Sequence, residues 1–136
     1  MSVLRLLDTD TASYVIKRRS PELEHRLVSL EPSSVGISVI TRAELMYGLQ
    51  GLPPQHKLHA AVRQFLKVIQ TLPWDVDAAD FYAEIRHRLR LGGQLIGEMD
   101  MMIAAHALAA GAILVTNNIR HFERIPAPLL LENWTS

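Results

Sequence analysis

Short apolar stretches alternate along this chain with longer segments whose apolar positions repeat at helical spacing. Strand-like stretches are predicted at 3–7, 35–40, 71–76, 112–116 and 129–134, the last as an edge strand. Helices are predicted from Thr9 to about Arg18, from Pro21 to about Leu30, from Thr41 onward, after Pro54, after Asp77, and over 98–110. This alternation indicates an α/β protein, an α/β/α sandwich around a central, mostly parallel sheet.

The most informative segment is 96–118, IGEMDMMIAAHALAAGAILVTNN, which predicts a helix over 98–110 with a glycine at each end. Asp100 lies in the first turn, where the positive end of the helix dipole favours an anion. It shares a helical face with Ile103, so we expect it at the end of the buried face, while His106 points elsewhere.

Composition limits the choice of protein class. A chain of 136 residues with 49% hydrophobic and 21% charged residues is typical of one globular domain, here 1–136. Equal numbers of basic and acidic residues, 14 of each, leave nucleic-acid binding to local patches. The absence of cysteine excludes disulfides and thiolate metal sites. Neither a signal peptide nor a membrane span is predicted, so we expect a soluble, cytoplasmic protein.

Polar side chains recur where the predicted strands end. Asp8 directly follows the first strand, and Glu44 lies just past the second. Asp100 opens the helix that leads into strand 112–116, and Asn118 stands at the exit of that strand. Carboxyl ends of parallel strands share one edge of a sheet, so we expect these four side chains to converge there.

Convergence of three carboxylates requires a counterion, because unit charges about 4 Å apart repel by about 4 kcal/mol near a protein surface. Hard oxygen ligands favour Mg²⁺ or Mn²⁺. An ion so held can activate water and stabilise phosphoryl displacement, which is the chemistry of phosphodiester hydrolysis. Arg86 and Arg88 could hold substrate phosphates, or form only a solvated helix face.

Each acid taken alone also has a structural interpretation. Thr41 and Glu44 have the spacing of a capping box, and Asp10 and Asp77 suit helix N-caps. A non-catalytic binding module whose acids are caps therefore stays open.

Four segments together resemble the successive motifs of PIN-domain ribonucleases, specifically the VapC-type toxins of toxin–antitoxin systems. They are LLDTDTASYVIK (6–17), SVITRAELMYGL (38–49), 96–118 and RHFERIP (120–126). The resemblance implies a Mg²⁺- or Mn²⁺-dependent endoribonuclease that cuts tRNA or rRNA with metal-activated water. It also implies inhibition by a cognate VapB-like antitoxin and a homodimer within the toxin–antitoxin complex.

Position by position, Asp8, Glu44 and Asp100 match the three acids of that family, which implies that they hold the metal and carry catalysis. Asn118 stands where many members have a fourth, aspartate ligand, and is included among the expected catalytic residues. Thr116 matches the nearby hydroxyl position and is expected to contact substrate.

Three positions depart from the family pattern. Asp10 replaces a common asparagine, and His121 replaces a frequent acid. The amide at Asn118 leaves less negative charge, so we expect one well-held ion, with a second only when RNA is bound.

A haloacid dehalogenase-like phosphatase is the main alternative enzyme, because Asp8-Thr9-Asp10 imitates its first motif. The resemblance is poorer, since Ala12 occupies its threonine position and no lysine follows Lys67. A phospho-receiver domain also requires that late lysine.

Overall fold

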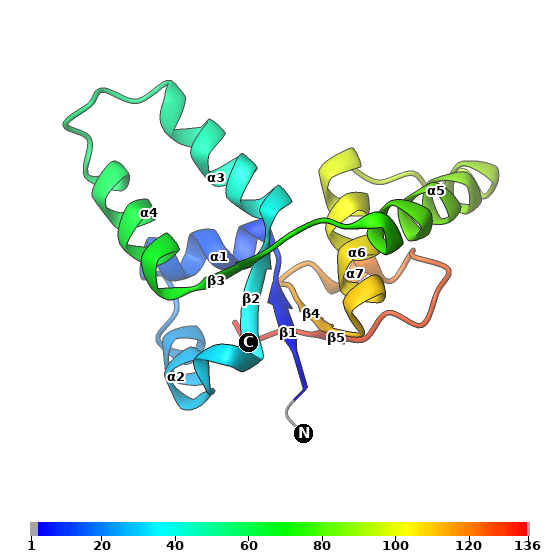
Figure 1. Ribbon diagram of the computed structural model, residues 1–136, viewed down its shortest axis with the longest axis horizontal. Helices are drawn as coiled ribbons and strands as arrows, with labels where there is room; N and C mark the ends of the chain where they lie inside the picture. Colours follow the sequence, from blue (N-terminus) through cyan, green and yellow to red (C-terminus); the bar gives the residue numbers. More distant parts are fainter. Residues whose placement is uncertain (1–2, 136) are drawn as a thin grey trace.

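The computed structural model describes residues 3–135, and within them a five-stranded sheet forms the centre of the molecule (Figure 1). The strands are β1 (Arg5–Leu7), β2 (Val35–Ser38), β3 (Gln70–Leu72), β4 (Ile113–Val115) and β5 (Leu131–Glu132). Their order is β3-β2-β1-β4-β5, and every pairing is parallel. The prediction of an α/β protein with a mostly parallel sheet is therefore confirmed.

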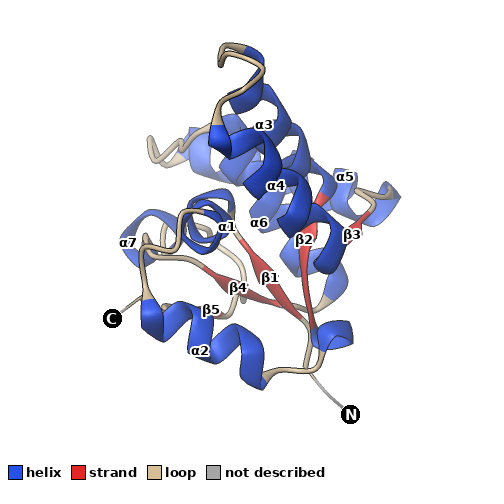
Figure 2. Ribbon diagram, turned by 90° about the vertical axis from the view of Figure 1, so that its left-hand side faces the viewer, coloured by secondary structure: helices blue, strands red, loops and turns tan. Residues whose placement is uncertain are grey.

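Helices cover both faces of the sheet. They are α1 (Thr9–Ile16), α2 (Pro21–Ser29), α3 (Val39–Gln50), α4 (Lys57–Val68), α5 (Val76–Leu91), α6 (Glu98–Ala110), the short α7 (Ile119–Phe122) and the 3₁₀ turn η1 (Pro32–Ser34). Figure 1 shows α1 to α4 on one side of the strands and α5 to α7 on the other. In Figure 2, α1, α2 and α4 lie in front of the sheet.

Adjacent leucines of β1 belong to two different hydrophobic cores, because successive strand side chains point to opposite faces. Leu6 packs with Leu114 and the apolar side chains of α5 and α6. Leu7 packs with Val115 and the apolar side chains of α1, α2 and α4. The pairing register places Leu6 beside Leu114 and Leu7 beside Val115, so β1 anchors both layers at the centre of the sheet.

The start of α3 differs from the prediction. The helix begins at Val39, two residues before Thr41, and its N-cap is Ser38, whose hydroxyl accepts a hydrogen bond from the backbone N–H of Ile40. The proposed capping box is therefore wrong, because Thr41 lies inside the helix. Glu44 therefore has no capping role at the start of α3.

The caps of α1 and α5 are also displaced by two residues from the predicted ones. Asp8, not Asp10, caps α1, and Asp75, not Asp77, caps α5. Each pair has an acid at both positions, and the sequence pattern does not distinguish a cap from a first-turn acid, which the helix dipole also favours.

The predicted helix over 98–110 is observed with the same bounds as α6, and Gly111 ends it in the left-handed conformation at φ 63°. That conformation is unfavourable for residues with a Cβ, which explains the glycine. The short α7, whose last residue Phe122 was expected to begin a loop, was not predicted. Within the described residues, no helix is long and apolar enough to cross a membrane.

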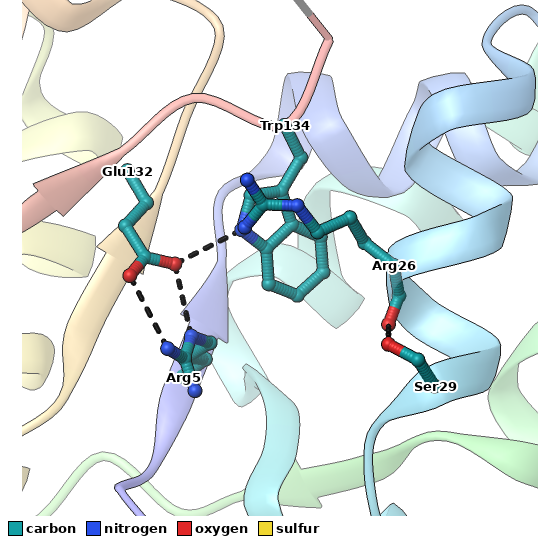
Figure 3. A network of polar contacts seen from close by, with 5 residues as sticks. All are labelled: Arg5, Arg26, Ser29, Glu132 and Trp134. Atoms are coloured by element: carbon teal, nitrogen blue, oxygen red, sulfur yellow. Dashed lines mark hydrogen bonds and ion pairs between the residues drawn. The ribbon is translucent and has the colours of Figure 1, made fainter.

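A polar network fixes the edge strand β5 (Figure 3). Glu132 accepts hydrogen bonds from Nε and Nη2 of Arg5 at 2.9 and 3.2 Å, and from the indole N–H of Trp134 at 2.9 Å. The hydrogen bond from Arg5 is the main cause that lowers the pKa of the Glu132 carboxyl. The guanidinium of Arg26 lies 5.7 Å from the centre of the Trp134 ring, so α2 also contacts this end of the chain.

Candidate functional site

Three of the predicted site residues, Asp8, Glu44 and Asn118, come after the neighbouring strands β1, β2 and β4, whose arrangement Figure 1 shows. Asp8 comes directly after β1, and Glu44 lies in the second turn of α3, which follows β2. Asn118 follows β4 and is the N-cap of α7, while Asp100 lies in the first turn of α6. The expectation that they share one edge agrees with this topology.

Asp8 is the most deeply buried of these acids, with 3% of its surface exposed. Its backbone N–H donates to the carbonyl of Val115 at 2.9 Å, which extends the β1–β4 ladder, and its Oδ1 accepts from the N–H of Thr11 at 2.8 Å. Burial raises the pKa of the Asp8 carboxyl, against the opposing effect of hydrogen bonds from Thr116 and Thr11, and the charge of Asp10 raises it further. A buried carboxylate of this kind is stabilised by a nearby cation.

Glu44 is held by a residue that the sequence analysis did not include in the site. The hydroxyl of Thr9 donates to its Oε1 at 2.6 Å and also lies 3.1 Å from the hydroxyl of Thr41. Burial raises the pKa of the Glu44 carboxyl, the hydrogen bond from Thr9 lowers it, and the charges of Asp100 and Asp10 raise it. Glu44 is thus within electrostatic reach of acids from α1 and α6.

Asp100 contacts His121 of α7. The Nε2 atom of His121 lies 2.9 Å from Oδ2 of Asp100, and the imidazole packs edge-on against the ring of Phe122 at a centroid distance of 5.3 Å. The Asp100 side chain keeps 38% of its surface exposed, unlike that of Asp8. The predicted burial of Asp100 is therefore only partial, because it lies at the open end of α6.

Thr116 and Asn118 are joined to Asp8 at the end of β4. The Thr116 hydroxyl accepts from the backbone N–H of Asn118 at 2.9 Å, and a hydrogen bond from Thr116 lowers the pKa of Asp8. Thr116 is fully buried, which argues against its predicted contact with substrate and for a role in positioning Asp8. Asn118 is exposed, and its side chain makes no capping hydrogen bond to α7.

The two arginines proposed to bind phosphate both have partners within the protein. Arg86 donates to the hydroxyl of Tyr82 at 2.6 Å and to Oε1 of Glu98 at 2.9 Å, and so lies beside the start of α6. Arg88 donates to the carbonyl of Pro126 at 2.8 Å. Of the two, Arg86 is tied to the helix that carries Asp100, whereas Arg88 is turned toward the segment before β5.

His106, expected to point away from the helix face that Asp100 and Ile103 share, is packed against the start of α3. It is buried, and its Nδ1 lies 2.7 Å from the hydroxyl of Ser38, the N-cap of α3. Burial lowers the pKa of His106, an effect that the charge of Asp75 partly opposes. A neutral imidazole whose Nδ1 accepts from Ser38 explains this geometry, and the contact fixes α6 to the start of α3.

The donor chemistry of the site fits a hard divalent cation. Asp8, Glu44 and Asp100 offer carboxylate oxygens, and the pKa values of Asp8 and Glu44 are raised as expected where negative charge lacks compensation. Among residues 3–135, no three His, Asp or Glu side chains are already gathered at metal-binding distances. Each carboxylate is held through one of its oxygens, Asp8 by Thr11, Glu44 by Thr9 and Asp100 by His121.

Comparison with known proteins identifies the class to which this fold and site belong. The family model described as "PIN domain" matches residues 5–128, nearly the full length of the chain.

Comparison with individual proteins shows which group within this family the chain resembles. The chain is 39% identical to the "tRNA(fMet)-specific endonuclease VapC" of Salmonella typhimurium, over 95% of this chain and 96% of that protein. It is 40% identical to "Ribonuclease VapC2" of Haemophilus influenzae, over 95% of this chain and 96% of that protein. The solved structure of DNA-bound VapBC from Salmonella typhimurium superposes with a TM-score of 0.88 at 38% identity, covering 97% of this chain and 98% of that one. The chain therefore belongs to the PIN-domain family and, within it, to the VapC ribonucleases of toxin–antitoxin systems.

Proposed function

We propose that this VapC ribonuclease is a Mg²⁺- or Mn²⁺-dependent endonuclease that cuts a structured RNA, tRNA or rRNA, at the edge of the sheet that carries Asp8, Glu44 and Asp100. The observation that carries the proposal is the 2.6 Å hydrogen bond by which Thr9 holds the Glu44 carboxylate of α3 next to the segment that begins with the buried Asp8. The Salmonella relative named as specific for tRNA(fMet) supports tRNA as the substrate class.

A cation held by these three carboxylates would lower the pKa of a water molecule and offset the charge that develops on the phosphodiester oxygens. The chain's own contribution is to position the carboxylates. The N–H of Thr11 and the hydroxyl of Thr116 fix Asp8, and the hydroxyl of Thr9 orients Glu44. The neutral amide of Asn118 adds no charge, so three carboxylates support one tightly held ion.

The partner that we propose is a VapB-like antitoxin that covers this edge and blocks RNA, with toxin chains paired as homodimers in the complex. Solved VapBC complexes from Salmonella typhimurium and from Rickettsia felis superpose on this chain with TM-scores of 0.88 and 0.87, and both are described as bound to DNA. The shared fold over nearly the whole of each chain supports a partner of the same kind for this toxin.

The test is cleavage of labelled total tRNA and rRNA by the purified chain, with Mg²⁺, with Mn²⁺, and with a chelator. We expect cleavage only with metal, and none with Asp100→Asn. Asp77→Asn is the matched control. Asp77, like Asp100, is an acid in the first turn of a helix, and the substitution removes one exposed carboxylate outside the site. Equal cleavage by the Asp100→Asn and wild-type proteins, or activity that survives chelation, contradicts the assigned site.

The alternatives lose support from the same findings. A haloacid dehalogenase-like phosphatase does not agree with the PIN-domain match across residues 5–128. A non-catalytic module whose acids are caps explains Asp8, which does cap α1, but neither Glu44 nor Asp100 caps a helix.

A further inference from the structure

A hollow of about 450 Å³ lies between the end of α1 and the start of α4, away from the acidic edge of the sheet. Its lining residues are Ile16, Lys17, Arg18, Arg19, His56, Lys57, Leu58 and Ala61. Figure 1 shows these two helices side by side, with the end of α1 turned away from β1. Four of the lining side chains are lysines or arginines, and among the described residues no acid lines the hollow.

Helix stability explains only part of this positive charge. Lys17, Arg18 and Arg19 follow the carboxyl end of α1, where the helix dipole favours cations. Lys57 is the first residue of α4, where the dipole disfavours a cation, and the first turn of α4 has no acid. The charge on the α4 side therefore lacks a role in stabilising its own helix.

Little within the protein neutralises the cluster. The carboxylate of Glu24 lies 3.8 Å from Nε of Arg18, but that arginine side chain is 86% exposed, so this ion pair is weak. The guanidinium of Arg19 lies 6.0 Å from the centre of the Tyr14 ring, a contact that leaves its charge uncompensated. Because the whole chain has no net charge, the hollow is a local positive feature rather than part of a basic surface.

We infer that this hollow binds a phosphate group of the RNA strand a few nucleotides from the scissile bond. The inference rests on the proposed ribonuclease function. The helix α1 joins Asp8 to Lys17 and rises about 12 Å over its length, which corresponds to about four nucleotides of stacked strand. Lysine and arginine side chains supply the charge for a phosphate, while the apolar floor of Ile16 and Leu58 can contact the sugar.

The experiment measures RNA binding to the full chain in the Asp100→Asn background, so that bound RNA is not cut. Fluorescence anisotropy is recorded over a range of salt concentrations with a 12-nucleotide RNA and with a 4-nucleotide competitor. The test variant combines Lys17→Ala with Lys57→Ala. Its matched control combines Arg63→Ala with Lys67→Ala, which removes two exposed cations of α4 outside the hollow.

For the longer RNA we expect the test variant to bind more weakly and to reduce the slope of log affinity against log salt by about 1.4, at about 0.7 for each lost single-strand phosphate contact. The control should keep the wild-type slope, and the 4-nucleotide RNA should bind the test variant and the Asp100→Asn parent equally.

Three other outcomes are distinguishable. An unchanged slope in the test variant, while the wild-type chain still cuts RNA with metal, overturns this inference alone. Absence of metal-dependent cleavage and of RNA binding by the wild-type chain overturns the proposed function. If the test variant binds RNA normally but loses binding of a polyglutamate peptide, the hollow is a protein-binding surface and the inference is again overturned.

Discussion

The hydroxyl of Thr9 donates a 2.6 Å hydrogen bond to Oε1 of Glu44 and so joins the first residue of α1 to the second turn of α3. This is the shortest polar link between the segments that follow β1 and β2 at the site. It holds a carboxylate whose pKa is already raised by burial and by the charges of Asp100 and Asp10.

Removal of the Thr9 hydroxyl is predicted to impair cleavage most at acidic pH. The hydrogen bond lowers the pKa of Glu44, so Thr9→Val raises that pKa further and reduces the ionised fraction as the pH falls. We expect the acid limb of the kcat/KM profile to move to higher pH, whereas Thr9→Ser restores it. The same acid limb in Thr9→Val and wild type contradicts a role for this contact in catalysis.

Asp8→Asn is predicted to stabilise the metal-free protein while abolishing cleavage. The folded protein raises the pKa of Asp8, so this residue favours folding below its usual carboxyl pKa, and that contribution is lost as pH rises through the raised value. In chelator at pH 7.5 we expect a gain of about 1 kcal/mol in the free energy of unfolding, since asparagine still accepts from Thr11 and the unpaired charge is gone. Urea denaturation measures this, and the gain should shrink at pH 4.

Comparison of the wild-type chain with Asp8→Asn also tests metal binding without any activity measurement. Mn²⁺ should raise the Tm of the wild-type chain and leave that of Asp8→Asn unchanged, because a ligand stabilises only the fold that binds it. Equal shifts in both proteins contradict Asp8 as a ligand.

The buried contact of His106 with Ser38 predicts a loss of stability at mildly acidic pH. Burial lowers the pKa of His106 below its ordinary value of 6.5, so its stabilising contribution is present above that value and is lost as pH falls through the lowered one. Relative to His106→Gln, the wild-type chain should therefore lose part of its free energy of unfolding between pH 7.5 and 5. Exposed His25 is the control, and His25→Gln should behave as wild type.

The ion pair of Glu132 with Arg5 is predicted to stabilise the fold at neutral pH and to lose this effect in acid. Glu132→Gln should reduce the free energy of unfolding by about 1 kcal/mol, because the hydrogen bonds involve charged groups that are both partly buried. The folded pKa of Glu132 is lowered, so the contribution is present above its ordinary value of 4.5 and is lost as pH falls through the lowered value. Exposed Glu84, changed to Gln, should have little effect.

Arg86→Ala is predicted to weaken RNA binding and to reduce its salt slope by about 0.7. Arg86 lies beside Glu98 at the start of α6, one turn or less from Asp100, so an RNA phosphate near the site can compete for its guanidinium. Exposed Lys67 on α4, changed to Ala, is the control. An unchanged slope assigns Arg86 a structural role with Tyr82 and Glu98.

The elements of the fold were largely predictable because each has a local signal. The apolar run at β4 predicts a buried strand, and the glycines on either side of α6 predict where that helix begins and ends. Both signals lie within a few residues and do not depend on the rest of the chain. Cap positions were less predictable, since Asp8 and Asp10 are equally good caps and only the β1–β4 pairing decides where the helix begins.

The site was predictable as a set of acids but not in its contacts. Asp8 and Glu44 could be chosen because each comes just after a predicted strand, and Asp100 because it opens the helix that leads into another strand. Strand ends and the helix starts beside them share one edge of a parallel sheet. Thr9 resembled an ordinary cap residue and His121 an ordinary surface histidine. Their partners are 35 and 21 positions away along the chain, and no local pattern carries that information.

By itself, the order of apolar and polar residues determined the parallel sheet, most of its helices and the edge of the sheet near which the acids lie, because strand and helix periodicity are local and crossover handedness is nearly invariant. The tertiary structure alone decided which carboxylate is buried, which hydroxyl each one meets, and that His106 turns inward to Ser38. Those outcomes depend on packing between distant segments, where burial and charge act through space rather than along the chain.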